Sequence, residues 1–196
     1  MSARRLRWDD PQLPSALGRA LDRGSVILFP TDTVYGLGGG PRSGAVDRVR
    51  SMKDRPTGQP FALHLSSLSA IERFAAVPVA ALPWIERLLP GPFTVLLPAA
   101  RDAPTCATYR GKVGIRVPDH PLFLKILTEI DRALFGTSAN RHGGRPLRSV
   151  EEVLGVFREV DLAIEGAAPR GIASSVIDLT RDPPHVLRGE LPKGDQ

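Results

Sequence analysis

The feature that most constrains the fold of this 196-residue chain is a glycine-rich stretch that follows an apolar run. Residues 26–29 read Val-Ile-Leu-Phe, a composition typical of a buried β-strand. Pro30 stops that run, and residues 31–40 then combine hydroxyl groups, a carboxylate and four glycines. Glycine lets a ligand approach the main chain closely, and α/β proteins place sites in loops that follow buried strands. The stretch therefore predicts a small polar loop, either a ligand site or a tight turn that needs glycine.

Strand-like and helical segments alternate along the rest of the chain. Strands are expected at residues 25–29, 61–65, 93–97, 113–117, 133–136, 161–164, 175–179 and 186–187. Helices are expected at residues 13–23, 43–53, 79–89 and 121–130, and after the capping-box patterns that begin at Ser69 and Ser149. Residues 55–60 and 101–111 are expected to be loops. The alternation predicts an α/β fold whose sheet is mixed, because the last strands follow one another too closely for helical crossovers.

The bulk composition limits the class of protein. A net charge of +5 favours an anionic partner such as a nucleotide, phosphate or nucleic acid, although an arginine-rich solvated surface has the same balance. The only cysteine, Cys106, excludes an internal disulfide and a cysteine-based metal site. No window approaches the roughly 18 apolar residues of a membrane helix, and no apolar region follows the first arginines. We therefore expect a cytoplasmic protein that does not contact a membrane.

Several common site motifs are missing from the chain. Gly36 and Gly38 would need a third glycine at position 41 for a dinucleotide fingerprint, and Pro41 stands there. The chain has no P-loop, no G-x-S-x-G and no H-E-x-x-H. The histidines lack the spacing of metal ligands; they are His64, His120, His142 and His185.

Cationic and hydroxyl side chains stand at the ends of several expected strands and helices. Arg116 lies within an apolar strand, so it either points to solvent or is held for an anion, because a buried arginine is rare without a partner. Each residue of this set, taken alone, also reads as a turn former or a surface charge. Together they suit a phosphate or carboxylate ligand. They are Lys53, Arg55, Ser138, Asn140, Ser174, Ser175 and Arg188.

Six short segments occur in an order that one protein family shares. They are Pro30–Gly38, Lys53–Pro56, Pro90–Thr94, Val113–Pro118, Thr137–Asn140 and Ser174–Asp178. With them the chain resembles the YrdC/Sua5 family of threonylcarbamoyl-AMP synthases, in its short, single-domain bacterial form. The resemblance implies a single YrdC-like domain over residues 13–190, with terminal extensions at 1–12 and 191–196. It also implies a twisted, open, mixed α/β sheet with helices packed on it and a large basic cavity.

The resemblance implies an ATP-dependent reaction in which L-threonine, bicarbonate (or CO2) and ATP give L-threonylcarbamoyl-adenylate and pyrophosphate. The product would supply the N6-threonylcarbamoyl modification of adenosine 37 in tRNA, through downstream threonylcarbamoyl-transfer proteins. Mg2+ is expected to arrive with ATP, since no metal site is evident in the sequence, although Asp32 is a candidate to help place the ion. A contact with tRNA or double-stranded RNA is a further expectation.

The resemblance also implies roles for particular residues. Lys53 and Arg55 would be catalytic. The residues expected to hold threonine are Thr31, His64, Arg116, Ser138 and Ser174. Those expected to hold ATP are Lys53, Arg55, Gln59, Lys112, Asn140, Arg148 and Arg188. Three of these depart from the family pattern, because Gln59 stands where asparagine is common and Lys112 and Arg148 stand where hydroxyl residues are common.

The residue types fit that chemistry. A carbamate oxygen of threonine would attack the α-phosphate, and both reactants are anions, so cations must offset their repulsion. Arg116 could grip the substrate carboxylate with two parallel bonds. No protein nucleophile is evident, so catalysis would rest on positioning and charge.

Two other functions stay open at this point. A tRNA- or double-stranded-RNA-binding module without turnover is compatible with the net charge, but only 6% of the residues are aromatic and available for stacking on bases. A carbamoyl-transfer relative that acts in hydrogenase maturation would need accessory zinc-finger or acylphosphatase-like segments, which this sequence lacks. A non-synthase branch of the family typically lacks the Lys-x-Arg and Ser-x-Asn pairs, and this chain has both.

Overall fold

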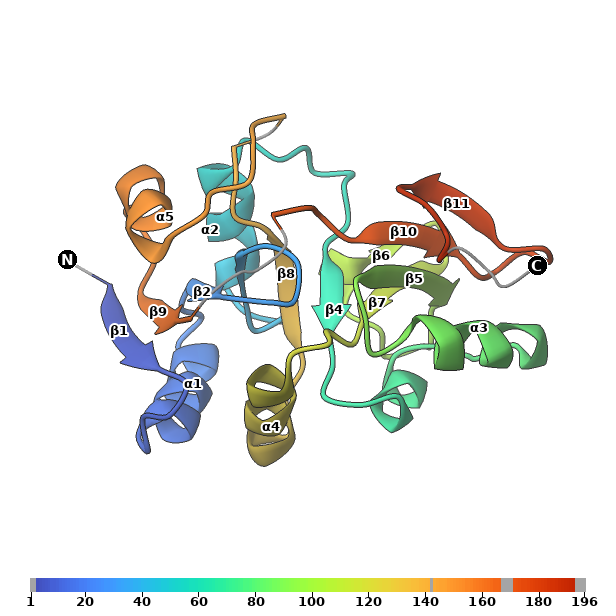
Figure 1. Ribbon diagram of the computed structural model, residues 1–196, viewed down its shortest axis with the longest axis horizontal. Coiled ribbons are helices and arrows are strands. Elements are labelled where there is room, and N and C mark those ends of the chain that lie inside the picture. The colour runs from blue at the N-terminus through green and yellow to red at the C-terminus, as the bar shows by residue number, and fades with distance from the viewer. Residues whose placement is uncertain (1–2, 142, 167–170, 193–196) are drawn as a thin grey trace.

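The computed structural model describes residues 3–141, 143–166 and 171–192, which form one open, mixed, eleven-stranded sheet with helices packed on it (Figure 1). The strands are β1 (Arg4–Arg7), β2 (Ile27–Phe29), β3 (Gly36–Gly39), β4 (Ala62–His64), β5 (Phe93–Pro98), β6 (Thr108–Tyr109), β7 (Lys112–Arg116), β8 (Leu134–Ser138), β9 (Leu162–Glu165), β10 (Ser175–Asp178) and β11 (His185–Arg188). Their order is β1-β9-β2-β3-β8-β4-β7-β5-β10-β11, and β6 pairs with β7 beside this path. The predicted α/β class with an open, mixed sheet is confirmed.

Helices cover both faces of the β1–β8 half of the sheet, with α1 and α4 below it and α2 and α5 above it in Figure 1. The α-helices are α1 (Leu13–Asp22), α2 (Ala45–Met52), α3 (Leu82–Leu88), α4 (Pro121–Ile130) and α5 (Val150–Val156). Short 3-10 turns lie at Ser69–Arg73, Val79–Ala81 and Thr105–Ala107. Strand β2 explains the two layers, because Ile27 and Phe29 belong to the core under α1 and α4 while Leu28 belongs to the larger core on the other face. No helix in the described parts of the chain is long and apolar enough to span a bilayer.

The glycine-rich stretch is not wholly a loop, and this corrects the prediction. Gly36–Gly39 is strand β3, which pairs antiparallel with β2 on one side and with β8 on the other. A Cβ built on Gly38 would lie 1.8 Å from the carbonyl oxygen of Phe135 in β8. Glycine is therefore needed here because the neighbouring backbone comes too close for any side chain. The polar loop is confined to the residues between Pro30 and Tyr35.

Other differences arise at the chain start and in the short helices. Arg4–Arg7, within the expected extension 1–12, forms β1 and pairs in parallel with β9. The Ser69 pattern forms a 3-10 turn in which Ser67, not Ser69, accepts a bond from a main-chain N–H, that of Ala70 at 3.3 Å. The predicted 79–89 helix divides into a 3-10 turn and α3, and the predicted 101–111 loop contains a 3-10 turn and β6.

The predicted helix start at Ser149 is confirmed, but only one of the two bonds of a capping box is formed. The Ser149 hydroxyl accepts the N–H of Glu152 at 3.0 Å, at the start of α5. The Glu152 carboxylate accepts the N–H of Arg148, the residue before the cap, at 3.0 Å, and not that of Ser149 as a capping box requires.

Candidate functional site

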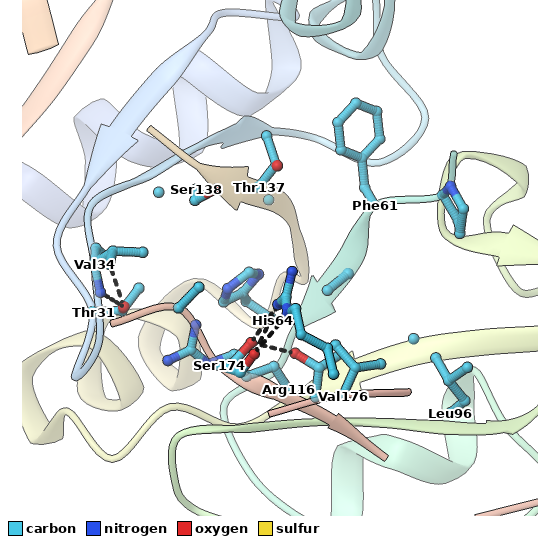
Figure 2. Close-up of a pocket in the computed structure, with 18 of the residues that line it drawn as sticks. Thr31, Val34, Phe61, His64, Leu96, Arg116, Thr137, Ser138, Ser174 and Val176 are labelled. Carbon is cyan, nitrogen blue, oxygen red and sulfur yellow. Dashed lines mark hydrogen bonds between the residues drawn. The ribbon is translucent and has the colours of Figure 1, made fainter. Parts of the chain in front are cut away.

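A cavity of about 390 Å³ lies over the centre of the sheet. Residues of the loop after β2 line it together with residues of β4, β7, β8 and β10 (Figure 2). The sheet register brings several of these residues together, because β4 and β7 are parallel and His64 lies opposite Arg116. On the next strands Gly36 lies opposite Ser138. Seven predicted residues line the cavity: Thr31, Arg55, His64, Arg116, Ser138, Ser174 and Arg188.

Arg116 is buried, and it is bound to a carboxylate. Its Nη2 donates to Asp32 Oδ1 at 2.6 Å and to Thr33 Oγ1 at 2.5 Å. Burial lowers the pKa of Arg116, and the Asp32 charge opposes that shift. A guanidinium can bind a carboxylate with two parallel bonds along either of two edges, Nη1 with Nη2 or Nε with Nη2. Both edges use Nη2. The expected two-bond grip on a substrate carboxylate is therefore not free in this conformation.

Thr31 organises the loop that carries Asp32. Its hydroxyl donates to the carbonyl oxygen of Val34 at 2.7 Å and lies 3.0 Å from the hydroxyl of Thr33. Thr31 Oγ1 also accepts the N–H groups of Thr33 and Val34, at 3.2 and 3.3 Å. Threonine at position 31 therefore closes a tight polar turn, which holds the loop against the cavity.

His64 is a neutral imidazole on the cavity wall. Burial, with the nearby charge of Arg116, lowers its pKa to about 3. Its ring meets Phe29 edge-on at 5.4 Å between centroids. A Cβ on Gly136 would lie 2.7 Å from His64 Cε1, so the glycine in β8 makes room for the ring. Nδ1 is buried and has no partner among the described residues.

Arg55 and Arg188 differ from Arg116 in their partners. Arg55 donates to the carbonyl oxygen of Pro60 at 2.7 Å and stacks over the Phe61 ring at 5.0 Å. Arg188 donates to the carbonyl oxygen of Ser174 through Nε at 3.1 Å and Nη2 at 2.8 Å. Neither forms an ion pair with a carboxylate of the described residues. Burial lowers the pKa of Arg55, and the charges of Arg50 and Arg188 lower it further. This part of the cavity therefore carries uncompensated positive charge.

Lys53 and Asn140 lie behind the cavity wall. The Lys53 ammonium donates to the carbonyl oxygens of Ser138, at 2.6 Å, and of Asn140. The Ser138 hydroxyl donates to Asn140 Oδ1 at 2.5 Å, and the Asn140 amide donates to the carbonyl of Gly144 at 2.8 Å. Burial, with the charge of Arg55, lowers the pKa of Lys53 to about 8. These bonds shape the turn that follows β8, and Ser138 is the member of the group that reaches the cavity.

Besides Lys53 and Asn140, three more of the residues expected to hold ATP lie outside the cavity lining. Lys112 shares a face of β7 with Arg116, but its ammonium pairs with Asp178 of β10 at 2.6 Å. Gln59 is half-buried in the loop before β4, and Arg148 is exposed. The assignment of these three residues to ATP stays a prediction.

Five of the other lining residues are large apolar or aromatic residues that sequence reasoning did not assign to a site. Each reads in the sequence as an ordinary strand or turn residue, so no local signal marks it as a wall of a site. Figure 2 shows Phe61, Leu96 and Val176 among the lining side chains. The five are Phe61, Leu96, Tyr109, Val176 and Leu187.

Fold and cavity together define an α/β protein with a partly polar cavity over the centre of an open, mixed sheet, and cavities of this kind are where such folds hold small ligands. Residues 19–189 match the Sua5/YciO/YrdC family model, which is described as "Telomere recombination". The chain belongs to the Sua5/YciO/YrdC family, and the resemblance drawn from its six segments is confirmed.

Three known proteins illustrate this relationship. A threonylcarbamoyl-AMP synthase of Pyrococcus abyssi is 36% identical over 86% of this chain and 52% of its own length. The crystal structure of P. abyssi Sua5 complexed with L-threonine superposes with a TM-score of 0.85 at 30% identity, over 96% of this chain and 57% of that one. The crystal structure of Escherichia coli YciO has the same TM-score at 28% identity, over 96% and 95%. The chain thus spans about half the length of the two Pyrococcus relatives.

Proposed function

We propose that this chain is a nucleotidyltransferase that makes L-threonylcarbamoyl-adenylate and pyrophosphate from L-threonine, bicarbonate and ATP. The observation that carries the proposal is one cavity in which Arg55 and Arg188 keep their positive charge while Arg116 is neutralised by Asp32. Two likenesses support it: to a Pyrococcus protein named threonylcarbamoyl-AMP synthase, and to a Sua5 structure complexed with L-threonine. The product would serve the modification of adenosine 37 in tRNA.

The amino acid would occupy the part of the cavity around Arg116. A zwitterionic amino acid carries no net charge, and the ion pair of Arg116 with Asp32 carries none either. The two therefore suit each other without leaving an unpaired buried charge. Single bonds from Arg116 to the ligand carboxylate would orient it. The neutral His64 ring and the Ser138 and Ser174 hydroxyls would contact its remaining polar groups and its methyl group. Thr31 would contribute by holding the loop at this end.

The phosphates would lie toward Arg55 and Arg188. Bicarbonate takes up a proton and releases water to give CO2. The threonine amine adds to CO2 and loses a proton, so the protons balance and a carbamate forms. One carbamate oxygen then attacks the α-phosphorus, and the bond to the pyrophosphate leaving group breaks. Cations without carboxylate partners offset the repulsion between these anions as they approach. Lys53, the second residue predicted to be catalytic, would add its charge from behind the wall while it holds the turn of Ser138.

Mg2+ would arrive with the phosphates of ATP. The cavity lining contains no aspartate or glutamate among the described residues, and Asp32 Oδ1 is already bound to Arg116. The same parts of the chain contain no cluster of three or more possible metal ligands. We therefore expect ATP, rather than these side chains, to carry the ion into the cavity.

Pyrophosphate release should depend on threonine. With ATP and bicarbonate present, we expect the purified protein to release pyrophosphate when L-threonine is added and to release little without it. L-serine should be a poor substrate rather than an excluded one, because a single methyl group contributes only about 1–3 kcal/mol of discrimination. A coupled pyrophosphate assay measures both. Release that is indifferent to threonine would refute the proposed function.

The rate should fall at alkaline pH as Lys53 loses its proton. Because its pKa is lowered to about 8, the ammonium charge is present below that pH and is lost above it. We expect the pH–rate profile to decline above about pH 8, and Lys53→Arg, which stays charged, to move the decline to higher pH. If the decline above pH 8 stays at the same pH in Lys53→Arg, the charge of Lys53 does not contribute to the rate.

The remaining expectations stay predictions. They are a contact with tRNA or double-stranded RNA, transfer of the product to downstream threonylcarbamoyl-transfer proteins, and a cytoplasmic location. An RNA-binding module without turnover is the alternative function. Steeply salt-dependent RNA affinity without pyrophosphate release would favour it.

A further inference from the structure

The buried pair of Arg116 and Asp32 sets the charge at one end of the cavity. Each residue is only 5% exposed, and Nη2 lies 2.6 Å from Oδ1. Of the two, only Arg116 is among the residues that line the cavity. Asp32 therefore acts on a ligand through Arg116 rather than by touching it.

The pair also limits how Arg116 can bind. Nη2 donates to both Asp32 and Thr33, which uses its two protons. Nε is buried and has no partner among the described residues, and Nη1 forms no hydrogen bond with them. The guanidinium therefore offers single bonds and not the planar fork that either a carboxylate or a phosphate could fill, so the charge of the pair, and not fork geometry, distinguishes the two anions.

We propose that Asp32 is a positioning residue that decides which anion this end of the cavity accepts. By holding Nη2 and neutralising Arg116, it admits the carboxylate of a zwitterionic amino acid and disfavours pyrophosphate and other polyanions. Polyanions are left to the uncompensated Arg55 and Arg188. The inference rests on the proposed function only for the identity of the amino acid. The charge selection at Arg116 stands on the geometry of the pair.

Asp32→Asn tests the proposal because it removes the charge and keeps the shape of the side chain. Calorimetric titrations of the purified full chain, without magnesium, would measure L-threonine and pyrophosphate separately. We expect L-threonine to bind about tenfold more weakly, because Arg116 loses its charged partner and its orientation. We expect pyrophosphate to bind about tenfold more tightly, because one unit of positive charge is uncovered near the ligand. A loss of structure alone cannot produce that gain.

Two matched variants separate charge from shape. Thr33→Val removes the other acceptor of Nη2 and leaves the charge, so threonine should bind more weakly while pyrophosphate affinity stays unchanged. Asp47→Asn, exposed on α2, makes the same change in net charge and should alter neither affinity. If folded Asp32→Asn binds pyrophosphate no more tightly than wild type, or if Asp47→Asn shows the same gain, the proposal is overturned.

Asp32→Glu covers the case in which Asp32→Asn does not fold. It keeps the charge but displaces the guanidinium, so threonine affinity should fall and pyrophosphate affinity should not rise. Tighter pyrophosphate binding, or threonine affinity equal to wild type, would contradict the proposal. If the wild-type protein itself does not bind L-threonine, the proposed function fails, and the pyrophosphate titrations still report on Asp32.

Discussion

Arg55→Ala is expected to lower the rate of threonine-dependent pyrophosphate release by about 10²-fold or more, as loss of a preorganised charge-stabilising donor does. Arg55 lines the cavity, and its guanidinium is held by the carbonyl of Pro60 and the ring of Phe61. Because no carboxylate of the described residues pairs with it, its charge is available to the reacting phosphates. The fall should appear mainly in kcat, since the charge on the attacked phosphate is largest in the transition state.

Two control variants make this result specific. Arg55→Lys should recover only a small part of the rate, because an ammonium can neither stack on Phe61 nor present a planar fork. Arg101→Ala, exposed in the turn after β5, removes the same charge far from the lining and should leave the rate unchanged. A near wild-type rate in Arg55→Ala would exclude Arg55 from the reacting part of the site.

Gly38→Ala is expected to destabilise the fold by on the order of 4 kcal/mol or more, the range of severe core and backbone disruptions. The new Cβ would lie 1.8 Å from the carbonyl oxygen of Phe135, in the strand that pairs with β3. Neither partner can yield cheaply, since both are backbone in the centre of the sheet. Total stabilities are about 5–15 kcal/mol, so much of the native population could be lost. Urea unfolding followed by circular dichroism measures the change.

Gly18→Ala is the matched control. Gly18 lies inside α1, and nothing lies within 4 Å of a Cβ built there. Alanine should raise the free energy of unfolding by about 0.5–1 kcal/mol, because glycine loses more chain entropy in a helix. If both substitutions have similar effects, close approach of β8 is not what requires glycine at position 38.

Local signals predicted the elements that carry them. Pro121 and the helical spacing of apolar residues after it indicated α4, and the Ser149 pattern indicated the start of α5. The apolar run at residues 26–29 indicated β2. In the two helices the signals come from residues a few positions apart, so a short window contains the information. For β2 the window shows only the apolar composition of a buried strand, and its pairing with β9 is not visible there. Arg4–Arg7 has no such pattern, because β1 is held by β9, about 160 residues later.

The chain order of six motifs was enough to identify the family and the chemistry worth testing. Only the folded protein could show which of those side chains share a wall. Arg116 forms an ion pair with Asp32, and Lys112 forms one with Asp178. Lys53 donates to the carbonyl oxygen of Ser138 from behind the cavity wall. A cation binds whichever acceptor the sheet register and the loop paths bring within about 3 Å. Residues more than 60 positions apart come within bonding distance only when the strands pair.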